Sequence, residues 1–294
     1  MQASVLIVSK NRADSLKKTL LILENLIDTS NNEILVFLDG CTDSSIELKL
    51  VFPQVRWFES TKSLGASVAR SKLYPNAKGK FLIGFDDDAH PLNADFIERI
   101  IKVFIKNPNV GIIAFEEIKG VFDSDDSAIK SSATNSIEFL TNEFIGCGFA
   151  IKKEAYEKTN GFPVWMDIYG EESCVAIEVL DKGYDIFYSN NIKVNHRIDK
   201  SKRKEAGKNY FRFGKQLEHT TYYFLVYYPS PLFRILKMYW HNFNKYALKD
   251  WCFFKMYFKT VFKVFVHTPK ILKYRNSVEK STLLKKSKLT PLKY

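Results

Sequence analysis

Short apolar runs alternate with helix-like segments along the first 119 residues, and this alternation restricts the possible folds most strongly. The runs are nearly continuous, as strands buried on both faces require, and the segments between them have apolar residues at helical spacing. This pattern is typical of an α/β fold whose mostly parallel sheet is flanked by helices. The runs are ASVLIVS (3–9), EILVFLDG (33–40), VRWFES (55–60), KFLIGFDDD (80–88) and VGIIAFEEIK (110–119).

Three of these predicted strands end in polar residues. SKNR spans residues 9–12, DGCTD spans 39–43, and three aspartates occupy 86–88. In open α/β sheets, ligands bind beyond the carboxyl ends of the strands. The sequence therefore predicts a polar ligand site at this edge of the sheet.

The aspartate triplet places three like charges side by side, which needs a compensating partner. Asp86 and Asp88 are two residues apart, so at the end of a strand both side chains point the same way. Mg²⁺ prefers one or two carboxylates together with substrate phosphates, and Mn²⁺ accepts the same ligands. We therefore expect Mg²⁺ or Mn²⁺ at Asp86 and Asp88, bridged to a nucleoside diphosphate. The alternative is a solvated acidic turn that caps the next helix.

Charge divides the chain into two parts. Residues 1–192 hold 20 Lys and Arg against 28 Asp and Glu, a net charge of −8, whereas residues 193–294 hold 24 against 5, a net charge of +19. The acidic part argues against nucleic acid as the main substrate, and the basic part requires an anionic partner. We predict a domain at 1–200 and a basic, aromatic-rich helical tail at 201–294.

Cysteine usage and the N-terminus bear on the cellular compartment. The four cysteines contain no CxxC pair, so neither a zinc site nor a disulfide framework is expected, which fits a reducing cytosol. The first apolar run lacks a cationic lead and is too short for a signal peptide or a spanning helix. Residues 120–142, rich in Ser, Asp and Thr, are predicted to form a surface insertion or a mobile loop over the site.

Six motifs occur in an order and at spacings that resemble those of family 2 glycosyltransferases, over roughly residues 3–197. The resemblance implies a GT-A fold and transfer of a sugar from a nucleoside diphosphate sugar to an acceptor hydroxyl. It also implies inversion at the anomeric carbon, a divalent metal held by a DxD motif, and a role in bacterial surface polysaccharide or lipid-linked oligosaccharide assembly. The motifs are SKNRADSLKKTL, FLDGCTDSS, SLGASVARSKL, GFDDDAHP, GCGFAIKKEAYEKTNGF and YGEESCVAIEVLDKGYDIFY.

Several residues are candidates for binding the nucleotide. Asp39 ends the second strand, where a carboxylate can accept hydrogen bonds from a base or ribose, and the resemblance assigns this position to the nucleoside. Asn11 and Arg12 match the nucleotide-side loop, although Asn11 could simply shape the turn. Asp86 and Asp87 are further candidates for contacts with the nucleotide.

Arg70 follows Gly65 at the start of a helix whose exposed N–H groups suit a diphosphate. The alternative is that Arg70 forms ion pairs with the carboxylates of this acidic part. The sequence contains no Walker or GxGxxG motif, so we expect the metal and isolated donors to hold the phosphates.

The segment YGEES supplies the candidate catalytic base. Sugar transfer requires a base to take the proton of the acceptor hydroxyl, and the resemblance assigns this role to Glu172. The alternative is that Glu171 and Glu172 are only first-turn acids of a helix. Cys174 replaces a third acid of the family pattern, which keeps a non-catalytic sugar-nucleotide or glycan-binding relative as an alternative. His196 matches a histidine that many relatives place near the metal, and it is a third candidate metal ligand.

The basic tail contains a predicted amphipathic helix over 245–265. Its lysines fall within an arc of about 120°, opposite Phe253, Phe254, Tyr257, Val261 and Val264. Such a helix can lie on an anionic membrane, which predicts a cytoplasmic protein peripheral to the inner face of the cell membrane. Alternatively, the apolar face packs on the rest of the protein. Nucleic acid is a less favoured partner because no recognisable binding motif accompanies the charge.

Overall fold

The computed structural model describes residues 1–133, 135–199 and 207–292. Its centre is a nine-stranded sheet in which β7 pairs with β9 and the other strands follow the order β3-β2-β1-β4-β8-β6-β9-β5. Strands β3, β2, β1, β4, β6 and β9 run in one direction, and β8, β5 and β7 run in the other. The prediction of a mostly parallel α/β sheet is confirmed. The strands are β1 (Ala3–Ser9), β2 (Asn32–Asp39), β3 (Arg56–Ser60), β4 (Phe81–Asp86), β5 (Ala89–Pro91), β6 (Val110–Lys119), β7 (Glu138–Thr141), β8 (Gly148–Lys152) and β9 (Asp185–His196).

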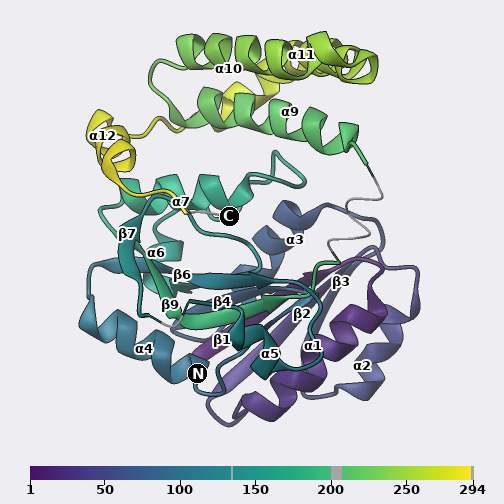
Figure 1. Ribbon diagram of the computed structural model, residues 1–294, viewed down its shortest axis with the longest axis vertical. Helices are drawn as coiled ribbons and strands as arrows, with labels where there is room; N and C mark the ends of the chain where they lie inside the picture. Colours follow the sequence, from purple (N-terminus) through teal and green to yellow (C-terminus); the bar gives the residue numbers. More distant parts are fainter. Residues whose placement is uncertain (134, 200–206, 293–294) are drawn as a thin grey trace.

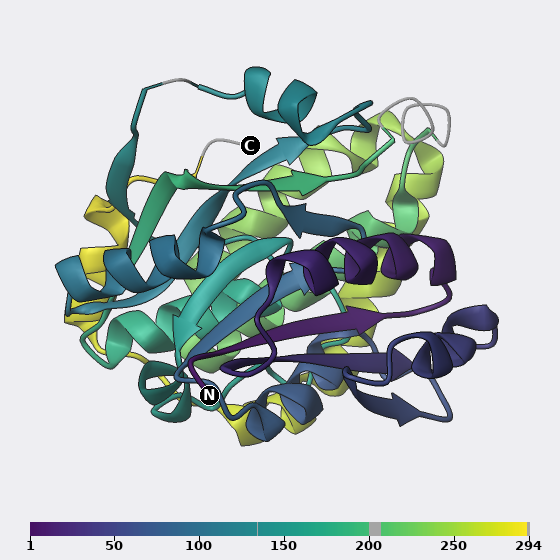
Figure 2. The ribbon, with the colours of Figure 1, turned by 90° about the horizontal axis from the view of Figure 1, so that it is seen from below.

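Helices cover both faces of this sheet (Figures 1 and 2). One face packs against α1 (Ala13–Leu26), α2 (Leu48–Val51) and α4 (Phe96–Lys106), which together with the strands bury one hydrophobic core. The other face packs against α3 (Ala66–Leu73), α6 (Lys153–Glu157) and α7 (Glu171–Asp181) around a second core. Short 3₁₀ turns lie at Ser44–Glu47, Tyr74–Asn76, Ala247–Lys249 and Leu272–Tyr274.

The segment 120–142 is more ordered than its composition predicts. It contains the helix α5 (Asp125–Lys130), whose N-cap residue Ser124 accepts a hydrogen bond from the backbone N–H of Ser127, and the strand β7, which pairs antiparallel with β9. The expectation of a loop was therefore wrong for these two elements. The helix is short and the strand largely exposed, so neither carries a clear hydrophobic period.

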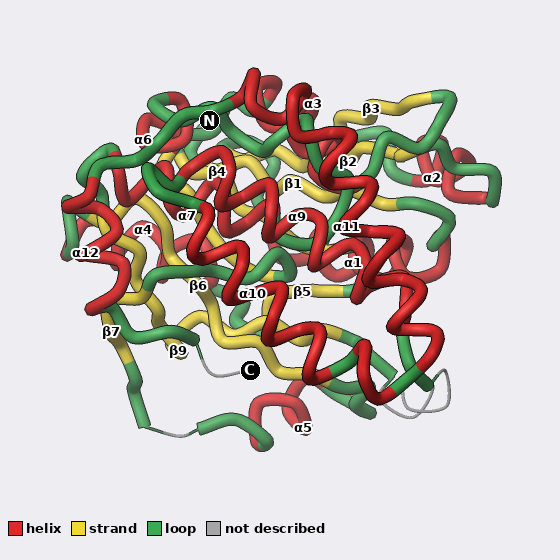
Figure 3. The backbone as a smooth tube through the Cα atoms, turned by 90° about the horizontal axis from the view of Figure 1, so that it is seen from above, coloured by secondary structure: helices red, strands yellow, loops and turns green. Residues whose placement is uncertain are grey.

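The C-terminal part consists of helices, as predicted. Figure 1 shows α9 (Tyr210–Tyr227) between the sheet domain and the outer pair α10 (Leu232–Lys245) and α11 (Trp251–Ile271), which Figure 3 shows from above. The last helix, α12 (Lys280–Lys288), returns to the sheet domain, where Thr282 donates a hydrogen bond to Asp181. The predicted boundary at residue 200 lies outside the described residues.

The apolar face predicted to meet a membrane instead packs inside the protein. Phe253, Tyr257 and Val264 of α11 are buried, and α11 packs against α9. The predicted helix over 245–265 is also shorter at its start, because Asp250 caps α11 by accepting hydrogen bonds from the backbone N–H groups of residues 252 and 253. Within the described residues, no helix has the length and apolar character needed to cross a membrane.

Candidate active site

The aspartate triplet lies where β4 ends and β5 begins. Asp86 is the last residue of β4, and Ala89 begins β5, where it pairs with His196 at the end of β9. This pairing brings His196 next to Asp88. The potential ligand atoms of Asp86, Asp88 and His196 all lie within 4.8 Å of one another. The structure thus brings together all three residues that the sequence predicts as metal ligands. We call Asp86, Asp88 and His196 the metal-ligand group.

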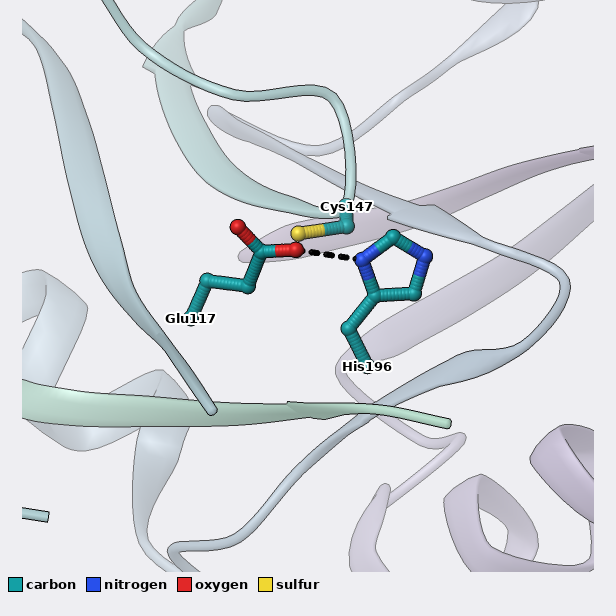
Figure 4. A group of neighbouring side chains, drawn as sticks. All are labelled: Glu117, Cys147 and His196. Atoms are coloured by element: carbon teal, nitrogen blue, oxygen red, sulfur yellow. Dashed lines mark hydrogen bonds and ion pairs between the residues drawn. The ribbon is translucent and has the colours of Figure 1, made fainter. Parts of the chain in front are cut away.

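Glu117 orients the imidazole of His196. Its Oε1 lies 2.5 Å from Nδ1 of His196 (Figure 4). The other ring nitrogen, Nε2, faces Asp88. A carboxylate on the far nitrogen of a metal-binding histidine fixes the ring and its tautomer. Cys147 lies beside this pair, but burial raises the pKa of its thiol well above the ordinary value, so it stays protonated and is a poor ligand for a hard cation.

The donor set fits a hard divalent cation. Asp88 Oδ1 is buried and accepts no hydrogen bond from the described residues, although His196 Nε2 lies 3.2 Å away. Burial disfavours the charged imidazole, but the nearby carboxylates of Asp88 and Glu117 outweigh this effect and raise the pKa of His196 to about 9. A cation bound at Nε2 would take the place of that proton. Two carboxylates and one imidazole suit Mn²⁺ and Mg²⁺.

Asp87 is not part of the group of possible metal ligands that contains its two neighbours. Its carboxylate accepts a hydrogen bond from Ser9 Oγ at 2.7 Å and pairs with Arg12 Nη1 at 2.9 Å. Burial raises the pKa of Asp87 to about 7. Arg12 also pairs with Asp88 through Nη2 at 2.6 Å, so it bridges the two aspartates and neutralises part of their charge. Nucleotide contacts by Asp87 and Arg12 stay predictions.

Arg70 lies among three carboxylates, as the ion-pair alternative predicts. Its Nη1 lies 2.9 Å from Glu172 Oε1 and 3.1 Å from Glu171 Oε1, and its Nη2 lies 3.0 Å from Asp86 Oδ1. The guanidinium is only 8% exposed. Burial raises the pKa of Glu171 to about 8, so this deeper acid is neutral near pH 7. Arg70 therefore joins the metal-ligand group to the candidate base Glu172, and a direct contact with a diphosphate stays a prediction.

Gly146 leaves room for the contact between Arg70 and Glu172. A Cβ atom at Gly146 would lie 2.4 Å from Glu172 Oε1 and 2.8 Å from Arg70 Nη2, which is closer than real Cβ contacts allow. Gly146 lies between β7 and β8, in the loop that faces α7. Gly146 is the first residue of the motif GCGFAIKKEAYEKTNGF, but the motif does not indicate this contact, because the close approach depends on residues more than 20 positions away.

These side chains open into a pocket of about 380 Å³. Its lining includes Asp86, Arg70 and Glu172 together with Arg212 and Gln216 of α9. The tail thus supplies part of the wall, which the sequence did not predict because no motif marks these positions. An adjoining pocket of about 440 Å³ shares both α9 residues and continues beneath α10 and α11.

Asp39 anchors the loop that precedes α3. Its buried carboxylate accepts hydrogen bonds from the backbone N–H groups of Leu64 and Gly65 at 2.6 and 2.9 Å and from the hydroxyl of Ser63 at 2.8 Å. Gly65 has a φ of +92°, and a Cβ there would collide with Asp167. The loop fixes the start of the helix that carries Arg70. A nucleoside contact by Asp39 stays a prediction.

Asn11 shapes the turn after β1. Its φ is +52°, in the left-handed region that Asn tolerates. The side-chain oxygen accepts a hydrogen bond from the backbone N–H of Thr42 at 2.7 Å, which ties this turn to the segment after β2. Asn11 therefore shapes the turn, as one of the two interpretations of the sequence predicts. Its contact with the nucleotide stays a prediction.

Cys174 lies on the side of α7 that faces the tail. Its side chain is fully buried in a cluster with Ile177, Tyr223 and Tyr227. The next turn of α7 carries Glu178, which accepts a hydrogen bond from the hydroxyl of Tyr227 at 2.6 Å. The residue that departs from the family pattern therefore packs against α9 and does not line the pocket that contains Glu172.

The chain is similar to several known proteins. Residues 4–159 match the family described as Glycosyl transferase family 2. An uncharacterized protein of Haemophilus influenzae is 29% identical over 113 residues, which cover 36% of this chain and 60% of that protein. The match thus spans less than two thirds of that relative's length.

Solved structures share the fold. The mannosyltransferase PcManGT of Pyrobaculum calidifontis, in complex with GDP-Man and Mn²⁺, has a TM-score of 0.57 and 17% identity, covering 99% of this chain and 76% of that one. TarS of S. aureus, residues 1–349, has a TM-score of 0.54 and 13% identity, covering 67% and 60%. GalNAc-T7 with UDP, GalNAc and Mn²⁺ has a TM-score of 0.53 and 16% identity, covering 67% and 44%. The sequence match to the family over residues 4–159, more than half of its length, shows that the chain belongs to glycosyl transferase family 2.

Proposed function

We propose that this protein is an inverting glycosyltransferase that moves a sugar from a nucleoside diphosphate sugar to an acceptor hydroxyl, with Mg²⁺ or Mn²⁺ as cofactor. The arrangement of Arg70 carries the proposal, because one guanidinium contacts both Asp86 of the metal-ligand group and Glu172. One of the proposed cation ligands, Asp86, therefore lines the same pocket as a carboxylate that can act as base. Similar structures hold GDP-Man with Mn²⁺ or UDP with Mn²⁺.

Different residues of the pocket and of the metal-ligand group would carry out different parts of the reaction. Asp86, Asp88 and His196 would hold the cation, and Glu117 keeps the imidazole in place. When bound, the cation neutralises the charge of the departing diphosphate. Glu172 would take the proton of the acceptor hydroxyl as its oxygen attacks the anomeric carbon. The new bond forms on the face opposite the breaking sugar–phosphate bond, which inverts the anomeric centre.

The environment of Glu172 suits this role. Both Glu171 and Glu172 line the pocket, but the side chain of Glu172 is 21% exposed, whereas that of Glu171 is only 4% exposed. Arg70 fixes the direction of the Glu172 carboxylate through one hydrogen bond to Oε1. A base that is positioned before the acceptor arrives loses little freedom on binding, which lowers the barrier.

For the acceptor, we propose a glycan or a lipid-linked sugar in bacterial surface polysaccharide or lipid-linked oligosaccharide assembly. The adjoining pocket of about 440 Å³ offers room for it next to the catalytic pocket. A cytoplasmic location is part of this proposal, and the four cysteines, all free thiols in the structure, are compatible with it.

A non-catalytic relative is now less favoured, because Cys174 packs against α9 and does not line the pocket that contains Glu172. The test is a panel of sugar nucleotides, screened for thermal stabilisation with and without Mn²⁺. We expect one donor to raise the melting temperature only with Mn²⁺, and the same mixture to release the nucleoside diphosphate slowly by hydrolysis. Stabilisation without any release, even with a range of acceptor sugars, would instead support a binding protein.

A further inference from the structure

The helix α11 is apolar on two opposite sides. One side is buried against α9, as described above. At 100° per residue, Phe258, Phe262 and Phe265 lie on the other side, together with Trp251. These four side chains are between 49% and 78% exposed. A helix that is apolar on both sides is normally covered on both. The described residues leave the outer side uncovered.

The neighbouring helix α10 repeats this arrangement. In α10 the side chain of Ile235 is buried. Four other apolar side chains of this helix are between 66% and 77% exposed: Leu232, Phe233, Leu236 and Trp240. These four positions fall within an arc of about 100°. They form a second apolar stripe that points away from the protein.

The two stripes meet in a chain of aromatic rings. Trp240 lies 6.5 Å from Phe243, which lies 6.3 Å from Phe258 across the helix pair, with the distances taken between ring centroids. Phe258 then contacts Phe254 at 4.7 Å, and Phe254 stacks on Trp251 at 5.1 Å. We call this continuous surface the outer apolar face. It comprises Leu232, Phe233, Leu236, Trp240, Trp251, Phe258, Phe262 and Phe265.

Positive charge borders the outer apolar face. Between Leu232 and Ile271 there are eight Lys and Arg, and Asp250 is the one acidic residue. The carboxylate of Asp250 caps α11 and pairs with Lys208 at 2.6 Å, so it does not neutralise the lysines of α10 and α11. Lys255 and Lys259 are exposed beside the apolar stripe of α11. Lys263 pairs with Glu218 of α9 at 2.8 Å. The surface thus combines large apolar side chains with exposed lysines at its rim.

We propose that the outer apolar face lies on an anionic lipid surface, with α10 and α11 in the plane of the headgroups. Interfacial helices of this kind place Trp, Phe and Leu at the acyl boundary and Lys and Arg on phosphates. The residues that would enter the lipid are not those that the sequence pattern indicates, since Phe253, Tyr257 and Val264 face α9. The proposal does not depend on sugar transfer.

Charge decides between a lipid surface and a second copy of the chain. Two copies meeting through this face would bring two basic rims together, which opposes the contact, whereas anionic headgroups neutralise the rim. Nucleic acid would also attract the lysines, but it offers no apolar layer to cover the Leu, Phe and Trp side chains.

The test is co-flotation of the full chain with vesicles of phosphatidylcholine alone or mixed with phosphatidylglycerol. We expect binding to the mixed vesicles that weakens with salt, and weak binding to phosphatidylcholine. Combining Phe258→Ser, Phe262→Ser and Phe265→Ser should lower the affinity by at least about tenfold. Lys255→Gln with Lys259→Gln should lower it by about tenfold on the mixed vesicles only.

The matched control removes three exposed apolar side chains elsewhere. Leu50→Ser, Ile105→Ser and Val121→Ser, at positions that are 67% to 87% exposed, should leave vesicle binding unchanged. Equal loss of binding in this control, or no loss in the triple phenylalanine variant, would overturn the proposal.

A second measurement uses the two outward tryptophans. Brominated lipids should quench the fluorescence of Trp240 and Trp251, and Trp240→Phe with Trp251→Phe should remove most of the quenching. Failure of the natural chain to bind mixed vesicles, a dimer that the triple variant dissociates, or tight binding to RNA instead would each contradict a lipid surface. Because vesicle binding is measured without donor, its failure is distinct from failure of catalysis.

Discussion

Arg70 donates a hydrogen bond to Glu172 at 2.9 Å, and this contact connects two elements that are about 100 residues apart in the sequence. Arg70 comes from α3, and Glu172 comes from the first turn of α7. The same guanidinium also contacts Asp86 at the end of β4. The buried guanidinium of Arg70 therefore positions both Asp86 of the metal-ligand group and the candidate base Glu172.

Removal of Arg70 should destabilise the protein strongly. Arg70→Ala would leave the carboxylates of Asp86 and Glu172 without their shared cationic partner, and breaking a buried ion pair costs about 3–5 kcal/mol in the free energy of unfolding. Chemical denaturation measures this change. Lys49→Ala is the control, because the Lys49–Glu59 pair lies at the surface and should contribute less than about 1 kcal/mol. Similar small losses in both variants would show that Arg70 does not hold the cluster together.

Glu172→Gln should slow sugar transfer by roughly 10²- to 10⁴-fold, because an amide cannot take the acceptor proton. Donor binding should survive, since the change keeps the shape of the side chain. Steady-state kinetics with a calorimetric donor titration separates the two effects. Glu143→Gln is the matched control in the same pocket, because its oxygen can still accept the bond from the backbone N–H of Leu292. An equal loss of donor affinity in Glu172→Gln would contradict a role as base.

Gly146→Ala should impair catalysis more than stability. The added methyl group would push against Glu172 Oε1 and Arg70 Nη2, which are ends of side chains and can move. Displacement of a catalytic group by about 1 Å can cost about 100-fold in rate. We expect the turnover number to fall while the melting temperature changes little. Unchanged turnover would mean that the Arg70–Glu172 contact does not set the position of the base.

The buried acid Glu171 should make stability depend on pH. Its pKa is raised from 4.5 to about 8, so the folded state holds a proton that the unfolded state releases. The stabilisation that this proton gives is complete below about pH 4.5 and is lost as the pH rises through 8. Glu171→Gln, which mimics the neutral acid, should flatten the fall in melting temperature between pH 5 and 8. Asp126→Asn, at an exposed position, should leave the curve unchanged, and an unaltered curve for Glu171→Gln would contradict a neutral Glu171.

Local patterns were enough to predict the strands β1 to β4 and β6 and the two aspartates of the metal-ligand group. Asp86 and Asp88 follow a buried apolar strand, and such strands and the direction of side chains at their ends depend on nearby residues. His196 was found through its resemblance to a motif. The partners of these residues were not predictable, since Glu117 reaches His196 only through the pairing of β6 with β9.

The tail shows that the helical spacing of apolar residues does not predict which side of a helix is buried. The spacing of apolar residues predicts that α11 has an apolar side, but α11 has two, and only packing decides which one is covered. Phe253 and Tyr257 meet α9 and its neighbours, whereas Phe262 and Phe265 remain outside. Arg212 of α9 was missed for the same reason, because its place in the pocket wall depends on how the tail folds back.

Calorimetric titration of UDP and of GDP, each with and without Mn²⁺, tests the central claim that Asp86, Asp88 and His196 hold a cation shared with the diphosphate. We expect one nucleotide to bind the natural chain only with Mn²⁺, and Asp88→Asn to abolish this dependence. Asp95→Asn, at a half-exposed acid outside the group, should bind as the natural chain does. Metal-dependent binding of unchanged affinity in Asp88→Asn would contradict the account.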